Sequence, residues 1–329
     1  MKHKVVRCTR CVMPETNGHI TLDTRGVCSV CLKQRRTGGE ERGGLERLRR
    51  SVAELKGRDC QYDSLVALSG GKDSTMTLYL AVKELGLSPL VVFIDNGFCH
   101  EAMYDNVRNA TRRLGVDLLI YKPQLIQQLF RHLLLLKSRV YYCRICNALI
   151  DVYIRRLALQ HNIPLVLGGH TKGQEFLKGT EMFWIYRASD AALIEAVHGL
   201  PEFSSVAEIF SSLAMYLHAN FKSIRFLSPF HFLDYAEEKI LAILTGELGF
   251  RLPEVSWPRG STNCLFNFVS QYLTVSYYGY SQHEAEISSL VRNKELERGR
   301  ALEIIETPIT PRQMGLSLER MGLTVDDIL

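Results

Sequence analysis

The 329-residue sequence has no long hydrophobic run. Its first residues, MKHKVVRCTRC, contain no apolar stretch of signal-peptide length, and no later run approaches the roughly 18 apolar residues of a membrane span. Even FRHLLLLKSRV holds only four leucines between charged residues. Internal repeats and low-complexity segments are also lacking. We therefore expect a soluble, cytoplasmic protein with no membrane partner.

Strong charge of either sign is lacking too. The formal net charge is +5, and hydrophobic residues make up 46% of the chain, which is an ordinary globular balance. A mildly basic chain permits a polyanionic partner such as RNA but does not require one. The length allows one large domain or two smaller ones with a sizeable core.

Cysteine is not scarce: the chain has nine. In the cytoplasm thiols stay reduced, so these residues are better read as metal ligands or catalytic groups than as disulfides. Cys8, Cys11, Cys28 and Cys31 follow the pattern C-x2-C-x16-C-x2-C. Four thiolates so spaced can close tetrahedrally around one zinc ion and let a segment without its own core fold. We expect a structural zinc module over residues 1–40.

Apolar runs and helix-forming stretches alternate after residue 61. Short buried-strand patterns occupy residues 62–68, 88–97, 116–123 and 163–170. Alternation of this kind predicts an α/β fold, a doubly wound parallel sheet covered on both faces. We expect this domain over residues 41–250, with a helical insertion at about 176–225, and a C-terminal helical region over residues 251–329.

The stretch VALSGGKDSTM, residues 66–76, lies where the first strand ends and a helix begins. Two glycines let the backbone approach a ligand closely, and a helix N-terminus attracts anions. The spacing does not fit the Walker pattern. It resembles the PP-loop signature of the N-type ATP pyrophosphatases, which share the adenine nucleotide alpha hydrolase-like fold. That resemblance implies cleavage of ATP between the α- and β-phosphates, with Lys72 at a phosphate and Asp73 associated with Mg²⁺.

The same resemblance implies a wider nucleotide site. FIDNG ends the second strand, where the family's adenosine rests, and LGGHTKGQ resembles the family's Gly-His segment. The sequence departs from the family after the histidine, where many relatives carry an acidic pair and this chain has Lys172, Gly173 and Gln174, followed by Glu175. His170 is equally compatible with a core or capping role. The expected ATP-binding residues are Leu68, Ser69, Gly70, Gly71, Lys72, Asp73, Ser74, Thr75, Phe93, Asp95, Gly168, Gly169 and His170.

Cys143 and Cys146 form a further C-x2-C pair, which needs another ligand to complete a metal site. Cys60, Cys99 and Cys264 remain, and Cys264 lies in a polar loop suited to a ligand. The arrangement resembles the iron–sulfur-dependent tRNA thiolation enzymes of the PP-loop family. That resemblance implies that Cys143, Cys146 and Cys264 hold a [4Fe-4S] cluster with one iron open for sulfide. A loose zinc site, unrelated buried cysteines or a Cys143–Cys146 dithiol that carries sulfur remain alternatives.

RCTRCVMPET, GVCSVC and the loop also resemble the N-terminal part of the N-acetyl sugar amidotransferases, which receive ammonia from a partner glutaminase. Channelled ammonia has no use for three interior cysteines, whereas sulfur transfer does. We therefore favour an enzyme that adenylates a substrate oxygen and replaces it with sulfur from a donor, over amidation and over nucleotide or nucleic-acid binding without turnover. The substrate is a tRNA, a nucleobase or a sugar-like metabolite, and a homodimer is compatible with the sequence.

Charged residues outside these motifs are weaker candidates. Asp234 or Glu238, at the start of a predicted helix, is placed near the substrate by a resemblance to the family's post-sheet segment. Acidic residues in a first helical turn more often complement the helix dipole. The remaining candidate phosphate or substrate contacts are Arg144, Lys172 and Arg259.

Overall fold

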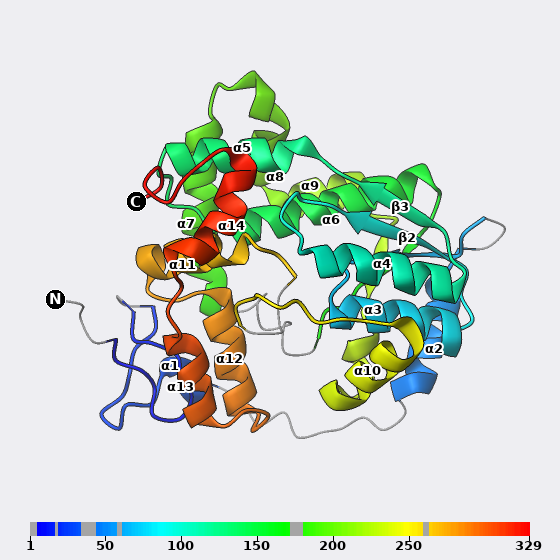
Figure 1. Ribbon diagram of the computed structural model, residues 1–329, viewed down its shortest axis with the longest axis horizontal. Helices are drawn as coiled ribbons and strands as arrows, with labels where there is room; N and C mark the ends of the chain where they lie inside the picture. The colour runs from blue at the N-terminus through cyan, green and yellow to red at the C-terminus, as the bar shows by residue number, and fades with distance from the viewer. Residues whose placement is uncertain (1–4, 17–18, 34–43, 58–60, 172–179, 259–262) are drawn as a thin grey trace.

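A parallel five-stranded sheet lies at the centre of the computed structural model, which describes residues 5–16, 19–33, 44–57, 61–171, 180–258 and 263–329 (Figure 1). The strand order is β3-β2-β1-β4-β5, and every pairing is parallel. The order reverses between β1 and β4, so the expected doubly wound α/β sheet is confirmed. The strands are β1 (Ser64–Ala67), β2 (Pro89–Ile94), β3 (Leu118–Tyr121), β4 (Leu165–Leu167) and β5 (Arg225–Leu227).

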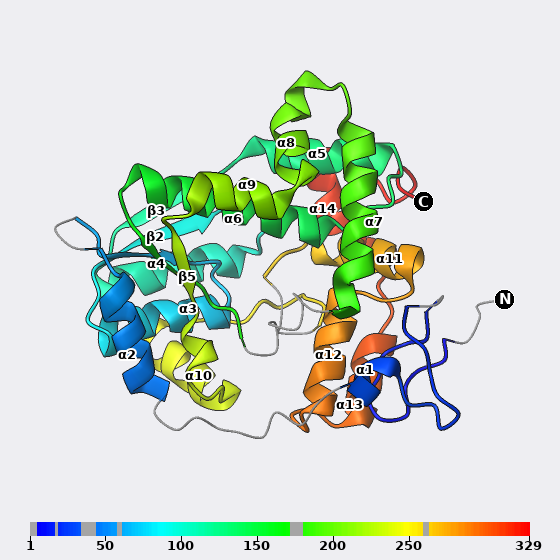
Figure 2. The ribbon, with the colours of Figure 1, turned by 180° about the vertical axis from the view of Figure 1, so that it is seen from behind.

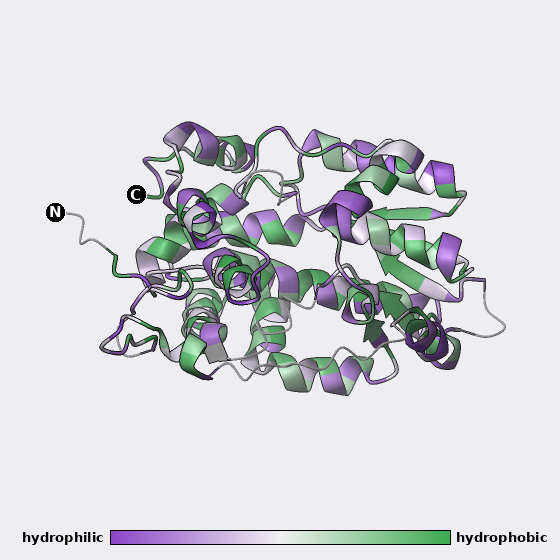
Figure 3. Ribbon diagram, turned by 90° about the horizontal axis from the view of Figure 1, so that it is seen from below, coloured by the Kyte–Doolittle hydropathy of each residue, from purple (hydrophilic) through white to green (hydrophobic). Residues whose placement is uncertain are grey.

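The central strands are apolar on both faces because helices cover both. Along β2, Leu90, Val92 and Ile94 pack into one hydrophobic cluster. Val91 and Phe93, which point the other way, pack into a second cluster. A strand buried on both faces reads as a continuous apolar run, which is why PLVVFI was recognisable from sequence. In Figure 3 the strands are accordingly green, whereas the surrounding helices alternate between green and purple.

The helices form two layers around the sheet (Figures 1 and 2). One layer consists of α2 (Gly44–Leu55), α3 (Lys72–Tyr79), α4 (Glu101–Leu114) and α10 (Glu237–Ile243), with π-helical turns at Leu80–Glu84 and Leu244–Leu248. The other layer is built on α5 (Gln124–Leu135) and α6 (Tyr142–Gln160). Because α6 begins at Tyr142, its first turn carries both Cys143 and Cys146.

The region expected to be mainly helical contains one strand that the sequence did not reveal. Helices α7 (Thr180–Val197), α8 (Ser204–Ser211) and α9 (Leu213–Phe221) lead into β5, which pairs with β4 at the sheet edge. β5 has only three residues, and its exposed Arg225 breaks the apolar run that made the equally short β4 recognisable. The stretch 204–221 is also two helices rather than one, because Ser212 leaves the helical region at φ −158° and ψ 86°.

The C-terminal region is helical, as expected. It contains α11 (Asn267–Tyr278), α12 (Gln282–Arg292), α13 (Arg298–Glu306) and α14 (Pro311–Leu318), with 3₁₀ turns elsewhere at Pro201–Phe203, Pro229–His231 and Glu319–Met321. The N-terminal segment, including α1 (Ser29–Lys33), lies against α12 and α13 in both views (Figures 1 and 2). Within the described residues, no helix is both long enough and apolar enough to cross a membrane.

Candidate functional site

The loop between β1 and α3 turns tightly at Gly70, whose φ is +79°. A Cβ at Gly70 would lie 2.6 Å from the carbonyl oxygen of Met103, so only glycine fits. Asn106, buried on α4, donates to the Gly70 carbonyl at 2.9 Å. The loop is therefore held by contacts outside the motif, and Asn106 is a supporting residue that no local pattern indicated.

The start of α3 leaves backbone donors for a ligand. Its N-cap, Gly71, provides no side-chain cap. The hydroxyl groups expected to face phosphate instead hold the loop: Thr75 Oγ1 donates to the Gly71 carbonyl at 2.8 Å, and Ser74 Oγ lies 2.9 Å from Ser69 Oγ. Uncapped N–H groups at a helix start are an anion-binding arrangement. The geometry is thus that of a phosphate site, with the backbone as its main donor.

Lys72 and Asp73 are both contacted by the segment that precedes α10. Lys72 Nζ lies 3.5 Å from Glu237 Oε1, and the Tyr235 hydroxyl donates to Asp73 Oδ1 at 2.7 Å. Burial raises the pKa of Asp73, while Lys72 and the Tyr235 hydrogen bond oppose that rise. Asp234 and Glu238, the acidic residues proposed from sequence, are exposed. Their neighbours Tyr235 and Glu237 are the ones that reach the loop.

The end of β4 packs tightly on this loop. A Cβ at Gly169 would lie 2.6 Å from the Ser74 backbone nitrogen, so a side chain there would push β4 away from α3. Gly168 donates its N–H to Leu227 of β5 at 3.1 Å. His170 is exposed, which excludes a core role for its ring. Residues 172–175, and hence the position of the expected acidic pair, lie outside the described residues.

Two of the expected ATP-binding residues, Phe93 and Asp95, lie at the end of β2, and a third, Leu68, directly follows β1. Asp95 is buried, accepts the Gly97 N–H at 2.8 Å and forms an ion pair with Lys122 at 3.3 Å. Leu68 and Phe93 are buried in the core cluster under α3 and α4, and Phe93 packs edge-on against Tyr104 at 5.5 Å. The Leu68 and Phe93 side chains therefore shape the site from beneath, and only their backbone stands near a ligand position.

Four cysteines from three separate segments lie beyond the carboxyl end of β2. Asn96, directly after Asp95, stands between them. Its Nδ2 donates to Cys146 Sγ at 3.4 Å and to Cys264 Sγ at 3.7 Å. Its Oδ1 accepts from Cys99 Sγ at 3.7 Å. The structure therefore brings Cys146 and Cys264 together, 118 residues apart in sequence, and adds Cys99 and Asn96 to the group.

Cys143 lies at the edge of the same group. Its Sγ contacts Ser270 Oγ at 3.1 Å, and the Cys143 and Cys264 thiolates would repel each other. Burial raises the pKa of Cys143 to about 12, and it also raises the pKa of Cys146, Cys264 and Cys99. The charge of Arg320 opposes this rise at Cys99 and Cys264 but does not offset it, so these thiols stay protonated at neutral pH. A bound cationic metal centre would stabilise their thiolate forms.

Helix α12 adds a polar group beside Asn267 and Cys143 that the sequence did not indicate. His283 Nε2 lies 2.9 Å from Asn267 Oδ1, which also accepts from Cys143 Sγ at 3.8 Å. His283 Nδ1 lies 3.5 Å from Glu286 Oε2. The negative charge of Glu286 raises the pKa of both Asp73 and Cys143, after burial as the main cause. The carboxylate of Glu286 is thus electrostatically coupled to the loop and the cysteines together.

Arg144, a candidate substrate contact, is engaged by the protein. Its guanidinium pairs with Asp190 at 3.4 Å and lies 4.7 Å above the Tyr186 ring. Its Nε and Asp190 Oδ1 are nevertheless buried without a hydrogen-bond partner among the described residues. One donor and one acceptor are thus left for a ligand or for water. The other candidate cations, Lys172 and Arg259, lie outside the described residues.

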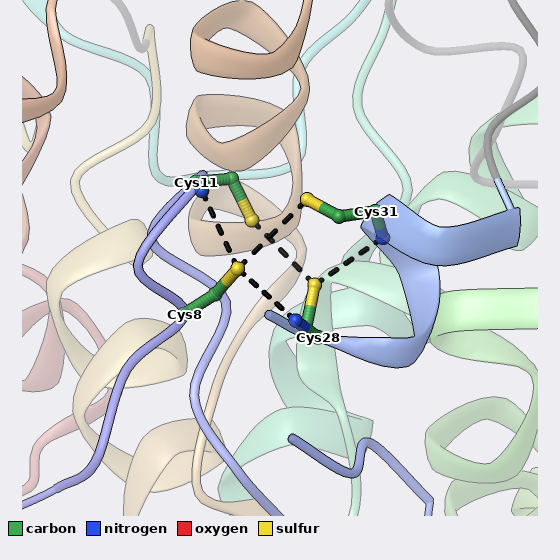
Figure 4. A group of neighbouring side chains, drawn as sticks. All are labelled: Cys8, Cys11, Cys28 and Cys31. Carbon is green, nitrogen blue, oxygen red and sulfur yellow. Dashed lines mark hydrogen bonds between the residues drawn. The ribbon is translucent and has the colours of Figure 1, made fainter. Parts of the chain in front are cut away.

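The N-terminal cysteines converge as expected, and all four are buried (Figure 4). Their sulfur atoms lie within 4.8 Å of one another, with Cys8 and Cys31 at 3.8 Å and Cys11 and Cys28 at 3.7 Å. Hydrogen bonds from the Cys28 and Cys31 thiols lower the pKa of Cys11 to about 2, and the Cys11 thiolate in turn raises the pKa of both partners. Four sulfurs this close fit a single tetrahedral metal ion.

Helices α12 and α13 hold this four-cysteine group in place. Arg298 donates to the carbonyls of Cys8 and Cys11 at 2.8 Å each. Arg292 Nη1 lies 3.8 Å from Cys11 Sγ, and its Nη2 forms a buried ion pair with Glu181 at 3.6 Å. The module also packs against Tyr141 and Met182 in one hydrophobic cluster. It therefore supports the segments that precede α6 and begin α7.

Comparison with known proteins bears on the sheet domain first. Residues 63–195 match the phosphoadenosine phosphosulfate reductase domain. This part of the chain is a PP-loop ATP pyrophosphatase-type domain. Domains of this type belong to ATP-utilising enzymes, and the loop around Gly70 and Lys72 lies within the matched residues.

The relatives outside the family match are of two kinds. An uncharacterised protein of Methanocaldococcus jannaschii is 26% identical over 325 residues, which is 97% of this chain and 100% of its own length. The glutamine-hydrolysing GMP synthase of Thermus thermophilus is 42% identical over 76 residues, which is 23% of this chain and only 14% of that protein. The likeness to GMP synthase is therefore confined to a short segment.

Two solved structures resemble the chain remotely. The U34-tRNA thiolase NcsA of Methanococcus maripaludis, solved with its [4Fe-4S] cluster, gives a TM-score of 0.37 at 13% identity over 92% of this chain and 88% of that one. The NH₃-dependent NAD synthetase of Campylobacter jejuni gives a TM-score of 0.39 at 15% identity over 85% of this chain and 92% of that one. Likenesses this remote do not decide between sulfur and nitrogen chemistry.

Proposed function

We propose that this chain is an ATP-dependent sulfur transferase that adenylates a substrate oxygen and replaces it with sulfur, releasing pyrophosphate and then AMP. One observation carries the proposal. Asn263, the residue before Cys264, donates to the carbonyl of Ser69 in the PP-loop at 3.1 Å. The cysteine group and the nucleotide loop are therefore adjoining parts of one site, rather than two separate features.

Activation falls to the loop. Lys72 and the uncapped N–H groups of α3 would hold the β- and γ-phosphates, and Asp73 would hold Mg²⁺; the absence of a side-chain cap at Gly71 supports the first role. The substrate oxygen attacks the α-phosphorus of ATP, the α–β bridging bond breaks, and pyrophosphate leaves. The carbon that bears the new adenylate is then open to a nucleophile. AMP leaves when that nucleophile adds and the carbon–oxygen bond breaks.

Cys143, Cys146 and Cys264 are the residues that would hold a [4Fe-4S] cluster. The donor set fits: Cys146 is buried, Cys143 and Cys264 are partly buried, and the Asn96 Nδ2 donates to Cys146 and Cys264. When bound, the cluster supplies one iron with an exchangeable position for the incoming sulfur. Asn96 and Asn267 orient the thiols in that arrangement.

We assign Zn²⁺ to the four N-terminal cysteines, because a closed set of four thiolates leaves no open position for catalysis. Its role is structural. The module braces Tyr141, whose backbone precedes the first turn of α6 and so helps to fix the Cys143–Cys146 pair.

The test is anaerobic reconstitution of the purified chain with iron and sulfide, followed by visible and EPR spectra. We expect a broad sulfide-to-iron band in the wild type, its loss in Cys143→Ala, Cys146→Ala and Cys264→Ala, and its retention in Cys11→Ala. ATP turnover with the accepting substrate should yield AMP and pyrophosphate, and Lys72→Ala should abolish it while the exposed-lysine control Lys83→Ala does not. ADP as the product would contradict the loop assignment.

Amidation is the alternative, and the short GMP synthase match is what favours it. Transfer of nitrogen needs no interior thiols. A chain that forms no cluster when reduced, yet turns over ATP with ammonia in Cys143→Ala as in wild type, would be an amidotransferase.

The salt dependence of tRNA binding would distinguish a tRNA substrate from a small molecule. Binding of bulk tRNA that weakens steeply between 50 and 200 mM salt would favour tRNA, because phosphate contacts dominate such binding, and no binding at low salt would favour a small molecule.

A further inference from the structure

Cys99 is the interior cysteine to which the proposed function gives no role, and its backbone is paired with that of Cys264. The two residues form an isolated antiparallel bridge, although 165 positions separate them in the sequence. Leu265 donates its N–H to the Phe98 carbonyl at 2.8 Å, and His100 donates to the Asn263 carbonyl at 3.3 Å. These bonds flank the pair, so Cys99 and Cys264 themselves occupy a non-hydrogen-bonded position.

That position has a defined geometry. In a non-hydrogen-bonded antiparallel pair the Cα atoms stand about 4.5 Å apart and the side chains leave the ladder on the same side. Disulfides need Cα atoms separated by about 4.4–6.8 Å. The backbone at Cys99 and Cys264 therefore meets the requirement for a disulfide without moving.

The side chains support the same conclusion. Both sulfurs meet the amide of Asn96, since Cys99 Sγ donates to Oδ1 at 3.7 Å and Nδ2 donates to Cys264 Sγ at 3.7 Å. Both thiols are free in this structure. Rotation about the Cα–Cβ bonds, with release of the Asn96 amide, is all that separates two thiols from a bond. Cys146 contacts the same amide but is fixed on α6 and has no backbone pairing to either residue.

We propose that Cys99 and Cys264 form a reversible disulfide under peroxide, a modification site that withdraws Cys264 from metal binding. Cys264 is partly exposed whereas Cys99 is buried, so peroxide reaches Cys264 first. The Cys264 sulfur attacks one peroxide oxygen, the O–O bond breaks, and a sulfenic acid and water form. The Cys99 sulfur attacks the sulfenic sulfur, the S–O bond breaks, and a second water leaves. The two thiols lose two electrons to one hydrogen peroxide.

The consequence for cluster loading rests on the proposed function, but the disulfide itself does not. An oxidised chain keeps only Cys143 and Cys146 of the three ligands. It should therefore lose the ability to take up a cluster and regain it after reduction by dithiothreitol. The site would stop working under oxidative conditions without irreversible damage to Cys264.

The experiment uses the full-length chain with its N-terminal metal and without a cluster. Treatment with one equivalent of hydrogen peroxide, followed by alkylation and peptide mapping without reductant, should show a Cys99–Cys264 cross-link and the loss of two free thiols. Cluster uptake should then fall at least tenfold and recover with dithiothreitol. In Cys99→Ser, and in Cys99→Ala as a second variant checked by circular dichroism, the cross-link should be absent. A second equivalent of peroxide should then oxidise the sulfenic Cys264 of these variants to sulfinic acid, so that reductant no longer restores uptake fully.

The possible failures are distinguishable. A cross-link between Cys143 and Cys146, or thiol loss to sulfinic acid without any cross-link, would overturn this inference while leaving the sulfur-transfer proposal in place. A reduced wild-type chain that takes up no cluster would overturn the proposed function, and the peptide map would still report whether Cys99 and Cys264 pair.

Discussion

Two groups of cysteines, one at each side of the molecule's core, are held in opposite ways. The N-terminal sulfurs approach one another directly at 3.7 and 3.8 Å, and backbone N–H groups of their own short loops point at them. The interior sulfurs meet through an intermediary, the side-chain amide of Asn96. The first group is close enough to hold one metal ion, and we propose that three thiols of the second hold a cluster.

These two arrangements indicate different roles for the two groups of cysteines. The N-terminal segment is short, and on our proposal a metal bound by its four cysteines supplies the stability that a larger core would otherwise provide. The interior cysteines instead sit among well-packed neighbours such as Phe98 and Phe266, whose rings are 4.9 Å apart. Loss of the first group should therefore damage structure, and loss of the second should damage chemistry.

Cys11→Ala removes one of the four N-terminal thiolates and should produce the largest effect. Three thiolates cannot close a structural site, and metal binding of this kind is worth on the order of 10 kcal/mol in small isolated domains. We expect the N-terminal metal to be lost and the module to unfold, which elemental analysis and limited proteolysis would detect. Iron uptake by the interior group should persist, although less efficiently. Retention of one zinc per chain in this variant would show that the four sulfurs do not act as one site.

Cys146→Ala removes one thiol from the interior group of cysteines. We expect complete loss of the cluster absorbance and of sulfur transfer, while the zinc content stays unchanged. Removal of a buried sulfur from a well-packed helix costs about 1–2 kcal/mol, so the melting temperature should fall only a few degrees. Visible spectra, zinc analysis and thermal unfolding of the same preparation provide the measurement. A collapse of stability as large as that of Cys11→Ala would make this group structural as well.

Asn96→Ala removes the side-chain amide through which the interior thiols meet, the contact that distinguishes this group from the N-terminal one. Outer-shell hydrogen bonds are typically worth about 10- to 100-fold in metal affinity. We expect cluster affinity to fall in that range, measured by competition with an iron chelator. Asn220→Ala, whose amide contacts only Tyr216 at the surface, is the matched control and should leave the affinity unchanged. Equal behaviour of the two variants would remove Asn96 from the cluster site.

Arg298→Met should give the smallest effect. Its guanidinium holds the carbonyls of Cys8 and Cys11 rather than their sulfurs. We expect roughly tenfold weaker zinc binding, at the low end for an outer-shell contact, and unchanged cluster uptake. The exposed Arg300, paired with Glu303 at 2.6 Å, offers Arg300→Met as the control. A greater loss of iron than of zinc in Arg298→Met would contradict the separation of the two groups.

Features whose residues lie close together in the sequence could be predicted, whereas features that join distant segments could not. Four strands and the nucleotide loop were recognisable because apolar runs and the Ser-Gly-Gly-Lys-Asp-Ser spacing are local patterns. β5 was missed because its three residues form no apolar run: Arg225 is exposed at the sheet edge, whereas the equally short β4 is wholly apolar and buried. Phe93 was expected at the nucleotide but packs in the core, since the strand's alternation directs its side chain under α4. For Asp234 and Glu238 the sequence favoured a helix-dipole role over a place near the substrate, and it is their neighbours Tyr235 and Glu237 that contact the loop, because the path of the segment selects the side chains.

The sequence alone was enough to predict two local features. These are a phosphate-binding turn at the end of a buried strand and four cysteines spaced to close on one ion. These follow from short-range geometry, in which spacing along the chain fixes distance in space. The tertiary structure was needed to show that Asn96, Cys99, Cys146 and Cys264 share one amide-centred group, and that Asn263 joins this group to the loop. Asn96 and Cys99 follow β2, Cys146 lies on α6 and Cys264 precedes α11, so only the packing of these segments on one another brings the four residues together.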